Sequence, residues 1–199
     1  MKKYELTDIR NGNLRRIRAL RDIPRYHVKA GDLGGWVETK NNLSQDGDCW
    51  VGDDAWVRGH AWVIENAWVG GNAVVRENSF IRDNARVDGN AWVYENACLE
   101  CDAQVKGDAR VYGSARVAQH GVINSAQDYL VVGPIGSRDD RTTFYRTASD
   151  IWVRCGCFNG SIDEFAENVR DTHGNNRYAQ EYMETIDYVK SVFERRNQE

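Results

Sequence analysis

The sequence has no apolar run near the roughly 18 residues that a membrane-spanning helix needs, so we expect neither a transmembrane segment nor a membrane partner. No apolar stretch follows the basic residues Lys2 and Lys3, which argues against a secretory signal peptide. The five cysteines are an odd number without the spacing of a disulfide framework. We therefore expect reduced thiols and a cytoplasmic protein.

A basic half or tail is also missing, and the net charge is −4 at pH 7. Proteins that bind nucleic acid usually carry a clustered positive charge, so we expect no nucleic-acid partner. The glycine-rich segment Gly133-Pro-Ile-Gly-Ser-Arg138 lacks the Lys-Ser/Thr ending of a phosphate-binding P-loop. The sequence therefore gives no support to nucleotide hydrolysis.

What the sequence does contain is a six-residue unit that repeats without interruption from Val51 to Val122. Each unit has an aliphatic residue, three turn-like residues, a small residue and one variable residue. The small residue is Ala everywhere except at Ser79 and Gly121. The aliphatic position holds Val51, Val57, Val63, Val69, Val75, Ile81, Val87, Val93, Leu99, Val105, Val111 and Val117.

A fixed short period predicts a β-solenoid, in which neighbouring coils bury each other's inner faces. Because side chains alternate along a strand, the Ala and Val of each Ala-x-Val triplet point inward and the residue between them points outward. Gly, Asn and Asp crowd the three positions after each Val, as turns require. Three turns close a triangle of about 18 residues, so this stretch predicts about four coils.

The repeat resembles the hexapeptide-repeat family of left-handed parallel β-helices over residues 51–122. The resemblance implies a left-handed coil, although parallel crossovers are otherwise nearly always right-handed. It also implies a homotrimer, since members commonly assemble around a three-fold axis. The fold does not define an activity, because the family includes enzymes, binding proteins and scaffolds.

The repeat divides the chain into three parts. We expect an N-terminal β cap over residues 1–48, a hexapeptide-repeat β-helix over 49–126 and a C-terminal α+β module over 127–199, giving a mainly β protein. An irregular first coil is expected to begin near Gly34. In the module we predict a β-β-β-α-α order with strands at 129–132, 142–146 and 151–155. Helices are predicted at 161–171, opened by the capping box Ser161-Ile-Asp-Glu164, and at 176–196.

Both flanks resemble a set of uncharacterised bacterial and phage proteins that are often labelled acyltransferase-like. The shared motifs are Gly31-Asp-Leu-Gly-Gly-Trp-Val-Glu38 before the repeat and Gly133-Pro-Ile-Gly-Ser-Arg138, Cys155-Gly-Cys-Phe158 and Thr172-His-Gly-Asn175 after it. The resemblance implies a phage-encoded protein that works in the host cytoplasm.

The variable position of the hexad points to solvent and forms three outward faces, with aromatic residues in the N-terminal coils. So large an aromatic surface is rarely left in water, so we expect the chain's own termini, a homotrimer, or both to cover it. The predicted interface residues are Trp50, Trp56, Trp62, Trp68, Phe80 and Trp92.

Catalytic residues are hard to find. In the resembling acyltransferases a histidine acts as general base beside bound coenzyme A, and His60 or His120 would have to fill that role. Both lie in the last turn position of a hexad, where Asn or Asp usually stands, so solvated corners are the alternative. Cys155 and Cys157 with His173 fall short of four zinc ligands, and we predict no metal.

The C-terminal module instead concentrates groups that suit an anion. The predicted ligand-binding residues are Arg138, Arg141, Arg154, His173, Asn175, Asn176 and Arg177. The preferred hypothesis is a non-catalytic binding protein without a cofactor, in which a trimeric shaft carries a module that binds a small anionic, nucleotide-like ligand or a host protein. The alternatives are a coenzyme A-dependent acyltransferase and a purely structural trimer.

Overall fold

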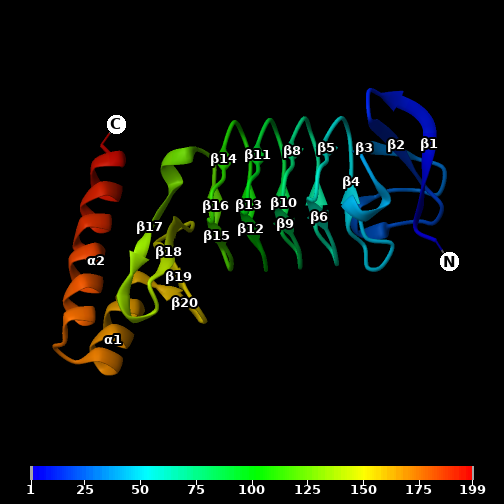
Figure 1. Cartoon of the computed structure of the whole chain (residues 1–199). Coiled ribbons are helices and arrows are strands. Elements are labelled where there is room, and N and C mark those ends of the chain that lie inside the picture. The colour runs from blue at the N-terminus through cyan, green and yellow to red at the C-terminus, as the bar shows by residue number, and fades with distance from the viewer. Residues whose placement is uncertain (1, 199) are drawn as a thin grey trace.

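Three sheets of stacked short strands form the centre of the molecule, with a β cap at one end and a sheet-and-helix module at the other (Figure 1). The structure, a computed structural model, describes residues 2–198. Among these residues no helix is long and apolar enough to cross a membrane. The predicted solenoid is confirmed.

The first sheet has seven strands, of which the last five belong to the solenoid: β1 (Tyr4–Asn11), β2 (Leu14–Ala19), β3 (Leu33–Val37), β5 (Trp56–Val57), β8 (Val74–Val75), β11 (Trp92–Val93) and β14 (Arg110–Val111). The second sheet comprises β4 (Trp50–Val51), β7 (Trp68–Val69), β10 (Arg86–Val87), β13 (Gln104–Val105) and β16 (Val122–Ile123). The third comprises β6 (Trp62–Val63), β9 (Phe80–Ile81), β12 (Cys98–Leu99) and β15 (Arg116–Val117).

Strands pair in parallel with residues 18 positions further on, as in Val57 with Val75 and Val75 with Val93. The Ala and Val side chains of the repeat are fully buried and form one continuous core. The corners turn at the third hexad position, where Asp53, Glu65 and the equivalent residues have a positive φ, except in the last hexad, where His120 at the fourth position has it. The repeat therefore sets both the coil length and the corners.

About five coils are present, namely the four predicted from the regular hexads and a first one that begins at β3, ahead of them. Val37 pairs with Val57, which is 20 residues further on, and Leu43 forms an isolated bridge with Val63. Two extra residues in this coil break the six-residue spacing. The expectation of an irregular first coil near Gly34 agrees with this geometry.

The N-terminal cap extends the first sheet, since β1 and β2 are antiparallel and β2 pairs with β3. Its attachment includes Lys3, whose buried Nζ donates to the Asp46 carbonyl at 3.2 Å and lies 3.0 Å from Cys49 Sγ. Burial lowers the pKa of this amine. The cap therefore closes one end of the solenoid with paired strands and specific contacts.

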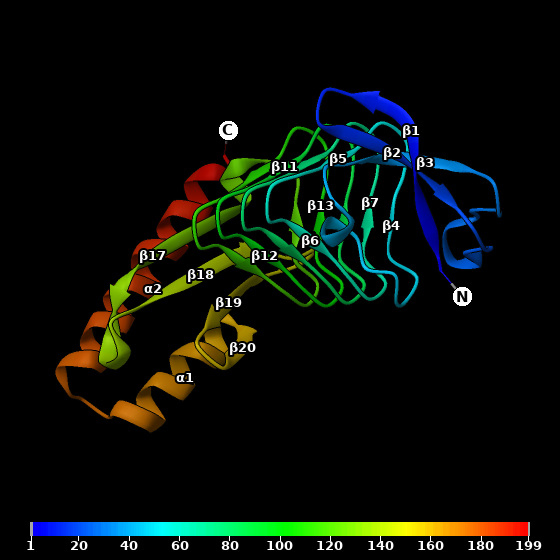
Figure 2. The same cartoon turned by 45° about the vertical axis from the view of Figure 1, so that its right-hand side comes forward.

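The C-terminal module has one antiparallel sheet followed by two helices (Figure 2). Its elements are β17 (Tyr129–Ile135), β18 (Asp140–Arg146), β19 (Ile151–Cys155), β20 (Phe158–Ser161), α1 (Ile162–His173) and α2 (Arg177–Arg196). The predicted capping box at Ser161 and Glu164 is present. The predicted order missed β20, whose Asn159 and Gly160 look like turn residues and become a strand by pairing with β19.

The module's sheet is buried on both faces. Phe144 packs with Phe165 and Val189 in the core beneath the helices, whereas the adjacent Tyr145 joins the core of the solenoid. This alternation follows from the period of two along β18. The sheet therefore closes the C-terminal end of the solenoid and positions the residues that follow.

Candidate functional site

The three motifs behind the repeat meet at the end of the module that points away from the solenoid, in a cavity of about 250 Å³ that we call the distal pocket. The loop after β17, the turn between β19 and β20 and the end of α1 each contribute. Its lining residues are Ser137, Arg138, Cys155, Cys157, Phe158, Phe165, Asn168, Val169, Thr172, His173 and Tyr182.

A glycine fixes the first of these segments against α2. Gly136 has a φ of +72°, and a Cβ atom there would lie 2.0 Å from the Tyr182 ring. Its N–H donates to Glu181 Oε2 at 2.9 Å. Only glycine allows this close approach, which places Arg138 at the mouth of the pocket.

Arg138 supplies the positive charge of the distal pocket. Its Nη1 lies over Gly156, 2.7 Å from the point a Cβ atom would occupy. Arg146 and Arg154 are paired with Asp128 and Glu100, but within residues 2–198 no carboxylate lies within ion-pairing distance of Arg138. An unpaired guanidinium that is partly exposed is suited to a carboxylate or phosphate ligand.

Other polar side chains surround this charge. The His173 ring stacks on Tyr182, with centroids 5.9 Å apart, and Thr142 Oγ1 lies 3.2 Å from Cys155 Sγ. The hydroxyl of Tyr182 is protonated at neutral pH, and burial raises its pKa further. Cys157 lies in the turn after Gly156, so the two cysteines do not share a strand.

The structure brings only two of the predicted ligand-binding residues, Arg138 and His173, into this pocket. Asn176 Oδ1 instead accepts hydrogen bonds from the backbone N–H groups of Tyr178 and Ala179, at 2.9 and 3.1 Å. The helix start predicted to hold an anion is therefore occupied by its own cap. Arg177 Nη2 donates to the hydroxyl of Tyr178 at 2.7 Å, and Asn175 lies exposed on the turn before α2.

Arg154 joins the module to the solenoid. Its Nη2 lies 3.1 Å from Glu100, a buried carboxylate of the solenoid that also pairs with Arg82. A buried charge needs such partners, because its desolvation is expensive. This network accounts for Arg154 without a ligand.

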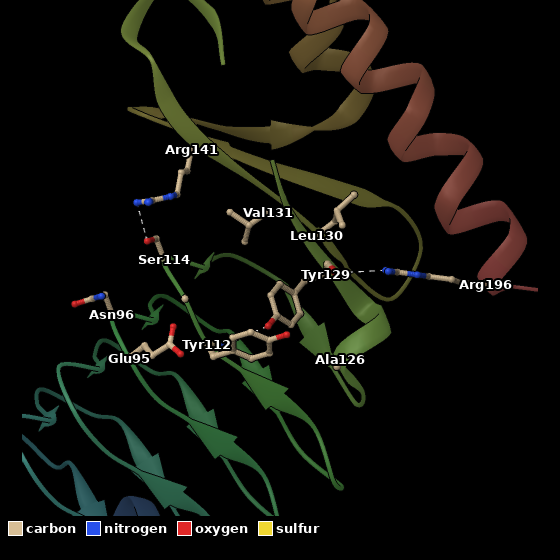
Figure 3. A pocket seen from close by; sticks show the side chains of 11 residues that line it. Glu95, Asn96, Tyr112, Ser114, Ala126, Tyr129, Leu130, Val131, Arg141 and Arg196 are labelled. Atoms are coloured by element: carbon tan, nitrogen blue, oxygen red, sulfur yellow. Dashed lines mark hydrogen bonds between the residues drawn. The ribbon is translucent and has the colours of Figure 1, made fainter. Parts of the chain in front are cut away.

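Arg141 lies in a different place, the junction cleft between the last coils and the module (Figure 3). The cleft has a volume of about 550 Å³. Arg141 Nη1 donates to Ser114 Oγ at 3.0 Å across it. Its lining residues are Glu95, Asn96, Tyr112, Gly113, Ser114, Ala126, Tyr129, Leu130, Val131, Arg141 and Arg196.

The two histidines of the acyltransferase alternative are exposed corner residues outside both sites. His60 follows the corner glycine Gly59, and His120 packs edge-on against Trp152, with centroids 5.7 Å apart. Within the described residues, no group of three or more His, Cys, Asp or Glu side chains gathers as a metal ion would need.

The strand register confirms the three outward faces, but their aromatic residues differ in exposure. Trp50 is only 1% exposed and leaves no surface for a second subunit, which removes it from the predicted interface. Trp68 packs on Tyr26 of the N-terminal segment at 4.9 Å. Trp62 and Trp92 remain 50% and 37% exposed. The chain's own N-terminal segment thus covers one face in part.

Sequence reasoning did not find several lining residues of the two sites. Tyr182 is an aromatic residue inside the predicted second helix and gives no sign in the sequence of lining a pocket, and Glu95 occupies the same hexad position as Glu77. The repeat does not distinguish these two glutamates, because only the position of the last coils decides which carboxylate bonds to the next coil and which faces the junction cleft.

No protein-family model matches the chain, and no curated protein matches it significantly. A function must therefore be inferred from the geometry of the sites.

Proposed function

We propose that the protein is a non-catalytic binding protein whose distal pocket holds the anionic group of a small, nucleotide-like ligand. The observation that carries this proposal is the convergence of Arg138 and His173, from two separate motifs, around one cavity. An unpaired guanidinium beside an imidazole and the hydroxyls of Ser137 and Thr172 offers several donors to one phosphate or carboxylate. A cavity of about 250 Å³ accommodates such a group and leaves the rest of the ligand outside.

The coenzyme A-dependent acyltransferase finds less support than binding. General base catalysis requires a base within hydrogen-bonding reach of the reacting group and a site that positions that group. His60 and His120 are exposed on separate corners, and neither lines the distal pocket or the junction cleft. The acyltransferase alternative would gain support if incubation with acetyl-coenzyme A released free thiol and if this turnover stopped in His60→Ala or His120→Ala.

Isothermal titration with inorganic phosphate, pyrophosphate and AMP tests the binding proposal. We expect at least one probe to bind and Arg138→Ala to weaken it at least about tenfold, since a charge-assisted hydrogen bond contributes about 1.5–3 kcal/mol. Arg58→Ala removes an exposed arginine of the solenoid and serves as the matched control. Equal affinity in the two variants would contradict the proposal, and binding of none of the probes would favour a protein partner.

We also propose that the solenoid is left-handed and assembles as a homotrimer. The resemblance of its hexads to that family and the exposure of Trp62 and Trp92 support this assembly. Light scattering after size exclusion should give three times the chain mass of 22.7 kDa. A single-chain mass at micromolar concentration would contradict the trimer, and a crystal structure would determine the hand.

A cytoplasmic location, in the host if the protein is phage-encoded, completes the proposal, with sequestration of a nucleotide signal as the role that fits it. All five cysteines are free thiols, which supports a reducing compartment. Titration of the denatured, unreduced protein with a thiol reagent should give five thiols. Recovery of disulfides from cells would argue against that compartment.

A further inference from the structure

Two polar ladders run along the solenoid corners. In the first, an acidic side chain at the positive-φ position accepts a hydrogen bond from the N–H of the equivalent residue one coil further on. The pairs are Asp53 with Gly71, Glu65 with Asp83, Glu77 with Glu95 and Asp83 with Cys101, at 2.7–2.9 Å. In the second, neighbouring asparagines bond through their amides, as in Asn78 to Asn96 at 3.3 Å.

On the corner that carries Glu77 and Asn78, both ladders end at Glu95 and Asn96, where the junction cleft begins. Glu95 Oε2 lies 3.9 Å from the Cβ position of Gly113, and its carboxylate makes no hydrogen bond or ion pair within residues 2–198. The residue equivalent to Asn96 in the next coil is Ser114, whose Oγ accepts a hydrogen bond from Arg141 instead. Since Asn96 Oδ1 already accepts from Asn78, its Nδ2 remains free to donate.

The opposite wall of the cleft carries two cations. Arg141 uses one nitrogen for Ser114 and keeps the others for a ligand. Arg196 Nη1 donates to the carbonyls of Gln127 and Tyr129, which fixes its guanidinium at the far edge of the cleft. Figure 3 shows the carboxylate and amide on the solenoid side and both arginines on the module side.

An aromatic surface lies between the two walls. Tyr112 stacks on Tyr94 with centroids 5.2 Å apart and an interplanar angle of 13°, and its side chain is 44% exposed. Tyr129 closes the cleft beside it, edge-on to Tyr112 at 6.4 Å. A supported and partly exposed ring can pack against a planar base.

We propose that the junction cleft is a second ligand site, separate from the distal pocket, and that it binds a guanine nucleotide. The Glu95 carboxylate accepts from the base N1–H and N2–H groups, and Asn96 Nδ2 donates to O6. Tyr112 contacts the base, and Arg141 and Arg196 attract the phosphate. Adenine fits poorly, because its Watson–Crick edge places an acceptor, N1, where the Glu95 carboxylate requires a donor.

The volume and charges of the cleft agree with this ligand. A cavity of about 550 Å³ falls within the range of sites for small molecules and exceeds the distal pocket more than twofold. One carboxylate and two guanidiniums leave a net positive charge that a phosphate balances. Inorganic phosphate alone would use only one wall and leave Glu95 unpaired.

Titration calorimetry with GMP, AMP, guanosine and inorganic phosphate tests the assignment. We expect GMP to bind at least about fivefold more tightly than each of the others, because one good bidentate pair gives about fivefold or greater discrimination between bases. Glu95→Gln should reduce GMP affinity to that of AMP, and Arg141→Ala to that of guanosine. Glu65→Gln is the matched control, because its carboxylate is already occupied by Asp83 N–H.

Any of four results would overturn the proposal. The first three are no GMP binding at millimolar concentration, equal binding of GMP and AMP, and a GMP affinity that Glu95→Gln leaves unchanged. Loss of GMP binding in Arg138→Ala would place the nucleotide in the distal pocket and likewise overturn the assignment to the cleft. Thermal melts of each variant show whether it is folded, and Tyr112→Ala provides an independent variant that should also weaken GMP.

Discussion

The solenoid and the C-terminal module differ in how their polar side chains find partners. Along the solenoid, corner carboxylates and amides bond to the next coil at a constant offset of 18 residues. In the module, the acidic partners of Arg146 and Arg154 come from distant elements, and Arg138 has none among the described residues. A periodic scaffold satisfies its own polar groups, so groups that are free to bind a ligand collect where the period ends.

Backbone strain at residues with a positive φ is also distributed differently in the solenoid and the module. Non-glycine residues occupy the left-handed backbone region at successive solenoid corners, including Glu65, Glu77 and Glu95. Their side-chain carboxylates are used in the ladder except at Glu95. In the module, a glycine serves a single close contact, that of Gly136 with Tyr182. The solenoid therefore repeats one corner geometry, whereas the module uses a positive-φ glycine for one particular contact.

The largest expected effect comes from the solenoid core. Leu99→Ala should lower the free energy of unfolding by about 3 kcal/mol, because it leaves a cavity in a fully buried stack. Gln104→Ala, on an outward face, should change it by less than about 0.5 kcal/mol. Chemical denaturation measures both. A small effect of Leu99→Ala would mean that neighbouring coils collapse into the space.

Two glycine-to-alanine substitutions test how much the close packing of Gly136 on Tyr182 constrains the module. Gly136→Ala should cost about 2 kcal/mol, since a methyl group would overlap Tyr182 in addition to the left-handed strain. Gly12→Ala, in the turn between β1 and β2, has a similar φ of +58° but open space around it, and should cost about 1 kcal/mol. Equal losses measured by denaturation would show that the contact with Tyr182 adds nothing.

The corner ladder predicts a smaller effect. Glu65→Ala should lower the free energy of unfolding by about 1 kcal/mol, because it removes the acceptor for Asp83 N–H and keeps the left-handed backbone. Glu65→Gly loses the same acceptor but relieves the strain, so we expect little net change. If both variants were equally destabilised, the strain at this corner would be negligible.

The smallest effect at neutral pH concerns two tyrosines that close the ends of the solenoid. Burial raises the pKa of Tyr4 and of Tyr129 from 10.0 to about 12. Between these values the unfolded chain releases the protons and the folded chain holds them, so stability should fall as the pH rises from 10 to 12. Denaturation across this range should show a shallower fall in Tyr4→Phe, and an unchanged slope would contradict the burial.

The sequence predicted the repeating part of the fold well, because each inward Ala and Val reports the same environment. The coil length, the outward faces and the capping box of α1 are confirmed. The irregular first coil was expected near Gly34, and its irregularity consists of two extra residues between Leu43 and Val51. Strand β20 was missed, because its formation depends on its partner β19 and not on its own residues.

The sites were less predictable for the same physical reason. The arginines of the module look alike in sequence, but Arg154 neutralises the buried Glu100, Arg141 spans the junction cleft and Arg138 faces the distal pocket. Which arginine is free depends on acidic partners far along the chain. Likewise, Asn176 was expected at an open helix start and instead caps that helix.

Native mass spectrometry of the freshly purified protein tests most directly whether the module holds a ligand. In Glu95→Gln, which removes the proposed guanine contact of the junction cleft, we predict a trimer that carries an additional small-molecule mass, with this mass lost when Arg138→Ala is added and kept when Arg58→Ala is added. A protein that is free of ligand in every preparation, or a bound mass that survives Arg138→Ala, would contradict the assignment of ligand binding to the distal pocket.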